Sequence, residues 1–237
     1  MKTARKILDF LLSSLFPNRC SVCGEVIEHK RHLCDNCKRF VAPIFSPVCH
    51  KCGVSLCDHN EEKCKEISAP VIGAFYYRDS VRRVIIDFKD TKRVSFFNCF
   101  SQGFFEKIAI EYAETDFDVV VCVPSYEKGK TTSKIIGKET AEHFFIPFDG
   151  DILEKYRATE KQHRLSMTER MTNLKNSIRV RNGKEGLVKD KTVLLCDDVK
   201  TTGSTLNECV KALYAAGAKD VYCACVAVSD YTTKKSG

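Results

Sequence analysis

The stretch VLLCDDVKTTGST, from Val193 to Thr205, decides how the rest of this sequence is interpreted. An apolar, partly β-branched run that is typical of a buried strand leads directly into two acids, Asp197 and Asp198. Small hydroxyl residues and a glycine follow, and a helical pattern begins immediately after them. The stretch therefore predicts a strand, a polar loop and the start of a helix in direct succession.

This order of elements predicts a binding site for a ribose 5-phosphate group. Ligands of open parallel sheets bind at the carboxyl ends of the strands, which is where the acidic pair is expected. Carboxylates accept hydrogen bonds from vicinal hydroxyls, whereas backbone amides at a helix N-terminus favour a phosphate. A single acid followed by a helix cap would indicate only a structural turn. Here two acids are followed by a glycine and four hydroxyl residues. The residues expected to contact the phosphate are Thr201, Thr202, Gly203, Ser204 and Thr205.

Alternating apolar runs and helical patterns predict an α/β fold after the first 68 residues. Continuous apolar runs of this length suit strands that are buried on both faces of a parallel sheet. Strands are predicted at 71–77, 117–124, 192–196 and 220–228, and helices at 80–93, 95–112, 133–144 and 205–217. The last strand, helix and strand form a βαβ unit with a right-handed crossover, and Gly217 ends its helix.

Eight of the 14 cysteines lie between Cys20 and Cys64, and this clustering predicts bound zinc. The C-x-x-C pairs place two thiolates on one turn, and such a short segment needs metal to fold, so one or two structural zinc ions are expected. The irregular last pair leaves open a crossed pairing, or a ligand role for His50 or His59. The predicted ligands are Cys20, Cys23, Cys34 and Cys37 for one site, and Cys49, Cys52, Cys57 and Cys64 for the other.

The chain divides into three predicted segments: an amphipathic helix at 1–18, a zinc-ribbon module at 19–68 and the α/β domain at 69–237. The N-terminal apolar run contains an acid and lacks a cleavage site for a signal peptide, so it predicts a packing helix. With no membrane span in the sequence, we expect a cytoplasmic protein. The formal net charge of +7 is compatible with an anionic partner, although many proteins simply have a basic surface.

The stretch Val193–Thr205 resembles the signature of type I phosphoribosyltransferases that binds phosphoribosyl pyrophosphate (PRPP). The resemblance implies that Asp197 and Asp198 hold the ribose 2′- and 3′-hydroxyls and act as the catalytic acids. It also implies that the residues from Thr201 to Thr205 bind the 5-phosphate, and that PRPP binds together with Mg²⁺.

With a cysteine-rich ribbon in front of this signature, the chain resembles the ComF family, which is associated with natural competence and DNA uptake. The stretches YYRDSVRRVIIDFKDTKR and KYRATEKQHRLSMTERMTNLKNSI support the resemblance. In the second stretch the family pattern falls on Arg157, Thr159, Gln162, Leu165, Arg170 and Asn173. Of these, Arg157, Gln162 and Arg170 are expected in a loop that folds over bound PRPP.

The turn after the strand at 117–124 departs from the ComF pattern. Arginines are usual in this turn of the family, but here it contains Lys128 and Lys130 after Pro124 and Ser125. Lysine presents a point charge where arginine presents a two-pronged donor. These four residues are therefore expected to meet the pyrophosphate, with lysines in place of arginines.

Three functions fit the sequence. The first is phosphoribosyl transfer, with an acceptor that the residues do not identify. The second is binding of single-stranded DNA within the competence machinery, which would require exposed aromatic rings and would weaken with salt. The aromatic candidates, Phe96, Phe97, Phe104 and Phe105, have the helical spacing of a core instead. The third is a PRPP sensor that binds the ligand without transferring it.

Overall fold

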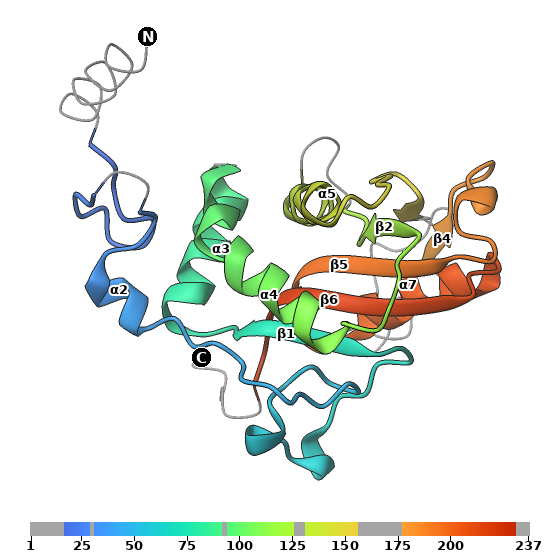
Figure 1. Ribbon diagram of the computed structural model, residues 1–237, viewed down its shortest axis with the longest axis horizontal. Helices are drawn as coiled ribbons and strands as arrows, with labels where there is room; N and C mark the ends of the chain where they lie inside the picture. The colour runs from blue at the N-terminus through green and yellow to red at the C-terminus, as the bar shows by residue number, and fades with distance from the viewer. Residues whose placement is uncertain (1–16, 29–30, 92–93, 126–130, 156–176, 231–237) are drawn as a thin grey trace, which may run out of the picture.

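A sheet of four parallel strands forms the centre of the molecule (Figure 1). The structure, a computed structural model, describes residues 17–28, 31–91, 94–125, 131–155 and 177–230. The predicted N-terminal helix lies almost entirely outside these residues. In spatial order, the strands are β1 (Val71–Tyr76), β6 (Asp220–Val228), β5 (Thr192–Lys200) and β2 (Val119–Cys122).

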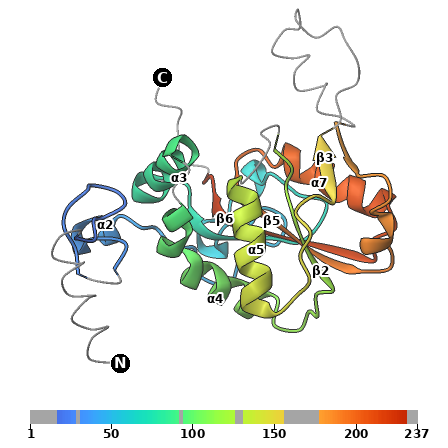
Figure 2. The same cartoon turned by 90° about the horizontal axis from the view of Figure 1, so that it is seen from above.

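Helices cover both faces of the sheet, as the two views show (Figures 1 and 2). One face carries α3 (Asp79–Thr91), the 3₁₀ segment η3 (Val94–Cys99), α4 (Ser101–Glu111) and α5 (Thr132–Phe144). The other face carries α7 (Ser204–Ala215). A second, antiparallel sheet pairs β3 (Leu153–Lys155) with β4 (Ile178–Val180), and η4 (Glu185–Leu187) leads on to β5. This architecture confirms the predicted α/β class with a parallel sheet.

The predicted phenylalanine core is confirmed for the rings that the structure describes. Phe97 and Phe104 are buried, and their rings meet edge to face at a centroid distance of 5.8 Å. The ring of Phe105 stacks on His143 at 4.1 Å and so joins α4 to α5. None of these three rings is therefore an exposed stacking platform for nucleic acid.

Strand β5 is longer than predicted. The sequence placed its end at Cys196, but the strand continues to Lys200 because β6 runs beside it and supplies partners. In that register Asp197 lies opposite Cys225 and Val199 opposite Ala227. The acidic pair consequently belongs to the end of the strand rather than to the loop, which fixes its backbone.

The cysteine-rich segment packs in two different ways. Its first half, with α2 (Asp35–Arg39), forms a small apolar cluster of its own around Cys20. Its second half contains the short 3₁₀ segments η1 (Leu56–Asp58) and η2 (Glu61–Lys63), and its apolar side chains belong to the main core. Those side chains are Ile44, Val48, Val54 and Ile67.

Within the residues that the structure describes, every helix is too short or too polar to cross a membrane.

The second half of the cysteine-rich segment packs closely against β1, and this packing predicts that Gly73→Ala destabilises the protein. A Cβ at this position would lie 2.7 Å from Cγ1 of Val228 and 3.1 Å from the carbonyl oxygen of Gly53. Overpacking of this kind lowers the free energy of unfolding by about 1–3 kcal/mol. Urea denaturation of the zinc-loaded protein measures the loss.

Gly186→Ala is the matched control, because a Cβ at Gly186 would have no heavy atom within 4 Å. We expect its unfolding free energy to stay within about 0.5 kcal/mol of the wild type. Equal stability of the two variants would contradict the tight contact at Gly73.

Candidate functional site

The acidic pair lies at the carboxyl end of β5, beside the end of β2. The amide of Val123 donates to the carbonyl of Cys196 at 3.1 Å, so the two strands end at the same level. A cavity of about 380 Å³ opens there. It is lined by Phe88, Lys89, Val123, Pro124, Ser125, Thr131, Thr132, Ser133, Lys155, Asp197, Asp198 and Thr205.

Hydrogen bonds fix one oxygen of each carboxylate. The hydroxyl of Ser133, in the first turn of α5, donates to Oδ1 of Asp197 at 3.0 Å. The amide of Asp198 donates to the same oxygen at 2.9 Å, and the amide of Val199 donates to Oδ1 of Asp198 at 2.7 Å. On its other oxygen, Oδ2, Asp198 pairs with Nζ of Lys89 at 2.9 Å. Both acids are thus held rigidly.

Both acids are buried, and this burial changes the pKa of Asp197. Asp197 and Asp198 are only 8% and 7% exposed. Burial, and then the neighbouring charge of Asp198, raises the pKa of Asp197 to about 8. Asp198 raises the pKa of Lys89, although burial alone would lower it. At neutral pH the site therefore favours a protonated Asp197, next to the ion pair of Asp198 with Lys89.

The loop after the acids brings a glycine and several hydroxyl groups to the start of α7. Gly203 begins α7 with a φ of +81°, a left-handed conformation that favours glycine. The hydroxyls of Thr202 and Ser204 lie 3.0 Å apart, and the amide of Ser204 is 3.4 Å from the Thr202 hydroxyl. Thr201 is exposed, and Thr205 lines the cavity. The predicted phosphate contacts therefore gather at the N-terminus of α7, next to the acidic pair.

Several cavity residues were not predicted from the sequence. Thr131, Thr132 and Ser133 begin α5, and a Thr-Thr-Ser run before a helical pattern is a signal that could have found them. Lys89 and Lys155 come from α3 and β3. Both lie in stretches that support the family resemblance, but no local pattern indicated that they line the cavity.

The predicted pyrophosphate turn and covering loop are described only in part. Pro124 and Ser125 line the cavity, and their contact with pyrophosphate stays a prediction. Lys128 and Lys130 lie outside the described residues, as do Arg157, Gln162 and Arg170.

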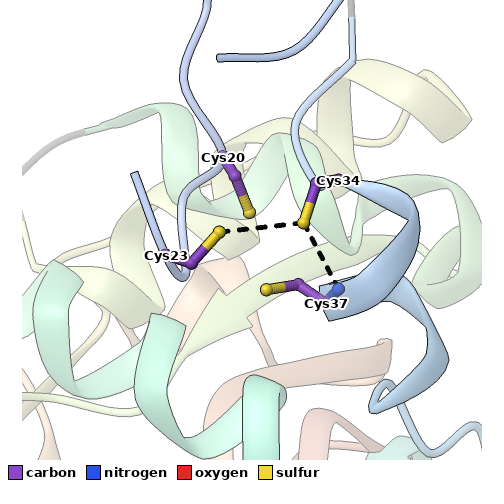
Figure 3. A group of neighbouring side chains, drawn as sticks. All are labelled: Cys20, Cys23, Cys34 and Cys37. Carbon is purple, nitrogen blue, oxygen red and sulfur yellow. Dashed lines mark hydrogen bonds between the residues drawn. The ribbon is translucent and has the colours of Figure 1, made fainter. Parts of the chain in front are cut away.

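The first cysteine group converges as a tetrahedral metal site requires (Figure 3). The Sγ atoms of Cys23 and Cys34 lie 3.7 Å apart, and the amide of Cys37 donates to Sγ of Cys34 at 3.4 Å. Two sulfurs bound to one zinc at 2.3 Å would be about 3.8 Å apart in a tetrahedron. Cys20, Cys23, Cys34 and Cys37 therefore fit a structural zinc ion.

The second group contains a histidine. Its four candidate ligand atoms, which lie within 4.8 Å of one another, belong to Cys49, Cys52, His59 and Cys64. Cys57, which the sequence placed in this set, is exposed and lies outside the group. Nε2 of His59 is buried and has no hydrogen-bond partner among the described residues. A metal ion would satisfy this nitrogen, so the group fits zinc with His59 as the fourth ligand.

Substitution of His59 and of Cys57 should have different effects on zinc content. We expect the wild type to hold two zinc ions per chain and His59→Ala to hold about one after dialysis against a mild chelator. Cys57→Ser should keep both ions, because its side chain lies outside the group. Elemental analysis measures the content, and loss of an ion only from Cys57→Ser would contradict this ligand set.

The raised pKa of Asp197 predicts a pH-dependent cost to stability. Between its ordinary value of 3.8 and about 8, the carboxyl ionises in the unfolded chain but stays protonated in the fold. Stability therefore falls as pH rises through this window, and the loss persists above it. Asp197→Asn should unfold with about 1 kcal/mol more free energy at pH 7 than the wild type, and the gain should shrink toward pH 4.

Asp116→Asn is the control for this measurement, because Asp116 is exposed and precedes β2 at the opposite end of that strand. Urea denaturation at several pH values distinguishes the variants. A gain in Asp197→Asn that is the same at pH 4 and pH 7 would show that the acid's ionisation is not its source.

Comparison with known proteins gives two family matches. Residues 11–68 match the double zinc ribbon domain, and residues 103–236 match the phosphoribosyl transferase domain. An APRTase from Giardia lamblia, among solved structures, is 19% identical and covers 58% of this chain and 68% of its own, with a TM-score of 0.37.

Curated relatives carry names related to DNA. The DNA utilization protein YhgH of Salmonella typhimurium is 26% identical over 219 residues, which cover 87% of this chain and 89% of the relative. Competence protein ComFC of Streptococcus pneumoniae is 27% identical over 228 residues, which cover 93% and 94%. With its double zinc ribbon and these relatives, the chain belongs to the phosphoribosyl transferase domain family and is of the ComF type.

Proposed function

We propose that the cavity at the end of β5 binds PRPP together with Mg²⁺. One observation carries the proposal: the buried acidic pair and Thr205, in the first turn of α7, line the same cavity. Neither feature alone defines a ligand, but a hydroxyl acceptor beside a phosphate cradle matches a phosphorylated ribose. The volume of about 380 Å³ falls within the range of small-molecule sites.

The two acids would recognise the ribose. Asp198, which pairs with Lys89, would accept a hydrogen bond from one of the 2′- and 3′-hydroxyls, and Asp197 would contact the other. The Ser133 hydroxyl and the backbone amides already hold both carboxylates in place, so little ordering is needed when the sugar binds. The hydroxyls and amides from Thr201 to Thr205 would receive the 5-phosphate.

Phosphoribosyl transfer is the reaction that such a site can support. The bond between C1 of the ribose and the diphosphate oxygen would break, and a bond from C1 to an acceptor would form. Bound Mg²⁺ would neutralise charge on the departing diphosphate. The protein's own part is to position the ribose and to supply fixed donors to the anion.

The relatives' names connect this site with DNA. We propose that the chain acts in DNA uptake or utilization, as the names of the relatives imply for those proteins. Direct binding of single-stranded DNA is less well supported, because Phe97, Phe104 and Phe105 pack between helices. A PRPP sensor differs from a transferase only in that it releases no diphosphate.

Loss of both acids should abolish PRPP binding. Calorimetric titration of the zinc-loaded wild type with PRPP and Mg²⁺ should show saturable binding, and Asp197→Ala/Asp198→Ala should show none. The sugar would lose both hydroxyl acceptors, an effect of about a hundredfold or more in affinity. Zinc content should equal that of the wild type.

A matched control removes two adjacent acids elsewhere. Glu61→Ala/Glu62→Ala removes the same number of carboxyl groups at an exposed pair in η2. Its PRPP affinity should stay within about twofold of the wild type. Unchanged affinity in the Asp197/Asp198 variant would show that the ligand assignment is wrong. Release of diphosphate on adding candidate acceptors then separates a transferase from a sensor.

A further inference from the structure

Lys89 and its neighbour Phe88 line the cavity although both lie outside the residues that match the transferase domain. Lys89 belongs to the last turn of α3, whereas the match to the phosphoribosyl transferase domain begins at residue 103. Its Nζ atom lies 2.9 Å from Oδ2 of Asp198, and its side chain lines the cavity. A segment outside the matched domain thus supplies part of the wall of the site.

A purely structural explanation accounts for only part of this arrangement. Lysine is favoured in the last turn of a helix by the helix dipole, and most exposed ion pairs contribute little. In this pair, however, the Asp198 side chain is only 10% exposed and belongs to the acidic pair itself, while the Lys89 side chain is 52% exposed. The lysine therefore reaches a buried acid and also remains accessible to a ligand.

The charge balance of the cavity gives this lysine a role. An anionic ligand that binds next to Asp198 meets a like charge, which must be compensated. Among the described residues that line the cavity, the two with positively charged side chains are Lys89 and Lys155. Lys89 is the one that pairs with Asp198, so its positive charge lies where it can offset the repulsion between Asp198 and an anionic ligand.

We propose that Lys89 is a binding residue of this site, which offsets the charge of Asp198 and contacts the anionic part of a phosphorylated sugar. The inference rests on the proposed function, since it assigns a further contact to the same cavity. It also makes α3 part of the ligand site, although the family match does not include this helix.

Lys89→Met tests the charge with little change in volume, and Lys89→Arg restores the charge. Calorimetry with PRPP and Mg²⁺ at several salt concentrations measures both affinity and its salt dependence. We expect Lys89→Met to bind about tenfold more weakly, with a flatter dependence on salt. Lys89→Arg should stay within about threefold of the wild type, with the salt dependence retained.

Lys138→Met is the matched control, because Lys138 is an exposed lysine on α5 that pairs with Glu142 at 3.4 Å. It should match the wild type in affinity and in salt dependence. Thermal unfolding and zinc content of each variant establish that the fold is intact.

The possible outcomes distinguish a failure of this inference from a failure of the proposed function. If the wild type binds PRPP and Lys89→Met binds it equally well, Lys89 is not a contact and the inference is overturned. Weaker binding with an unchanged salt dependence also overturns it, since that result indicates only a positioning role. If the wild type does not bind PRPP at all, the proposed function fails and the inference fails with it.

Discussion

The burial of two adjacent carboxylates at the end of β5 is the constraint on which the site depends. Placing like charges side by side away from water is costly unless each is hydrogen-bonded or paired. The structure meets this requirement from three directions: the Ser133 hydroxyl from α5, the amides of the strand itself, and the ammonium of Lys89 from α3. Residues of both helices line the cavity beside the strand's end, together with Lys155 of β3 and Thr205 of α7. The contacts that stabilise the buried acids therefore also position residues that line the cavity.

The loop after the acids is supported by the second half of the zinc ribbon. A Cβ at Gly203 would come within 2.2 Å of Cδ1 of Ile67, so the ribbon packs directly against the backbone that begins α7. Oδ1 of Asn207, in the first turn of α7, accepts hydrogen bonds from the amide and the hydroxyl of Ser68 at 2.8 and 2.9 Å. Glycine at position 203 is thus required twice, for its positive φ and for this close approach. The first cysteine group makes a separate small cluster and has no comparable position beneath the loop.

Local patterns in the sequence were enough to predict the strand, the acids and the loop, because the residues that form them are adjacent in the chain. The same holds for the C-x-x-C pairs, whose spacing is set by one turn of backbone. The extension of β5 to Lys200 could not be predicted, since it depends on how far β6 runs beside it. His59 and Cys57 differ by two positions, and only the path of the chain through η1 and η2 decides which one reaches the other thiols. Lys89 lies far from the signature in sequence, and the topology alone brings it to Asp198.

Loss of the second metal ion and loss of the acids should differ in how far each disturbs the rest of the site. Cys64 is a member of the second metal group, and only two residues separate it from Ile67, which packs against the loop. Release of the metal would free the segment that supports Gly203 and Asn207, and would disturb the start of α7. The acids, by contrast, are held by α3, α5 and their own strand, through contacts that involve none of the metal ligands. A change at the acids should therefore leave the metal in place, whereas loss of ligand binding is informative about the acids only when the zinc content is intact.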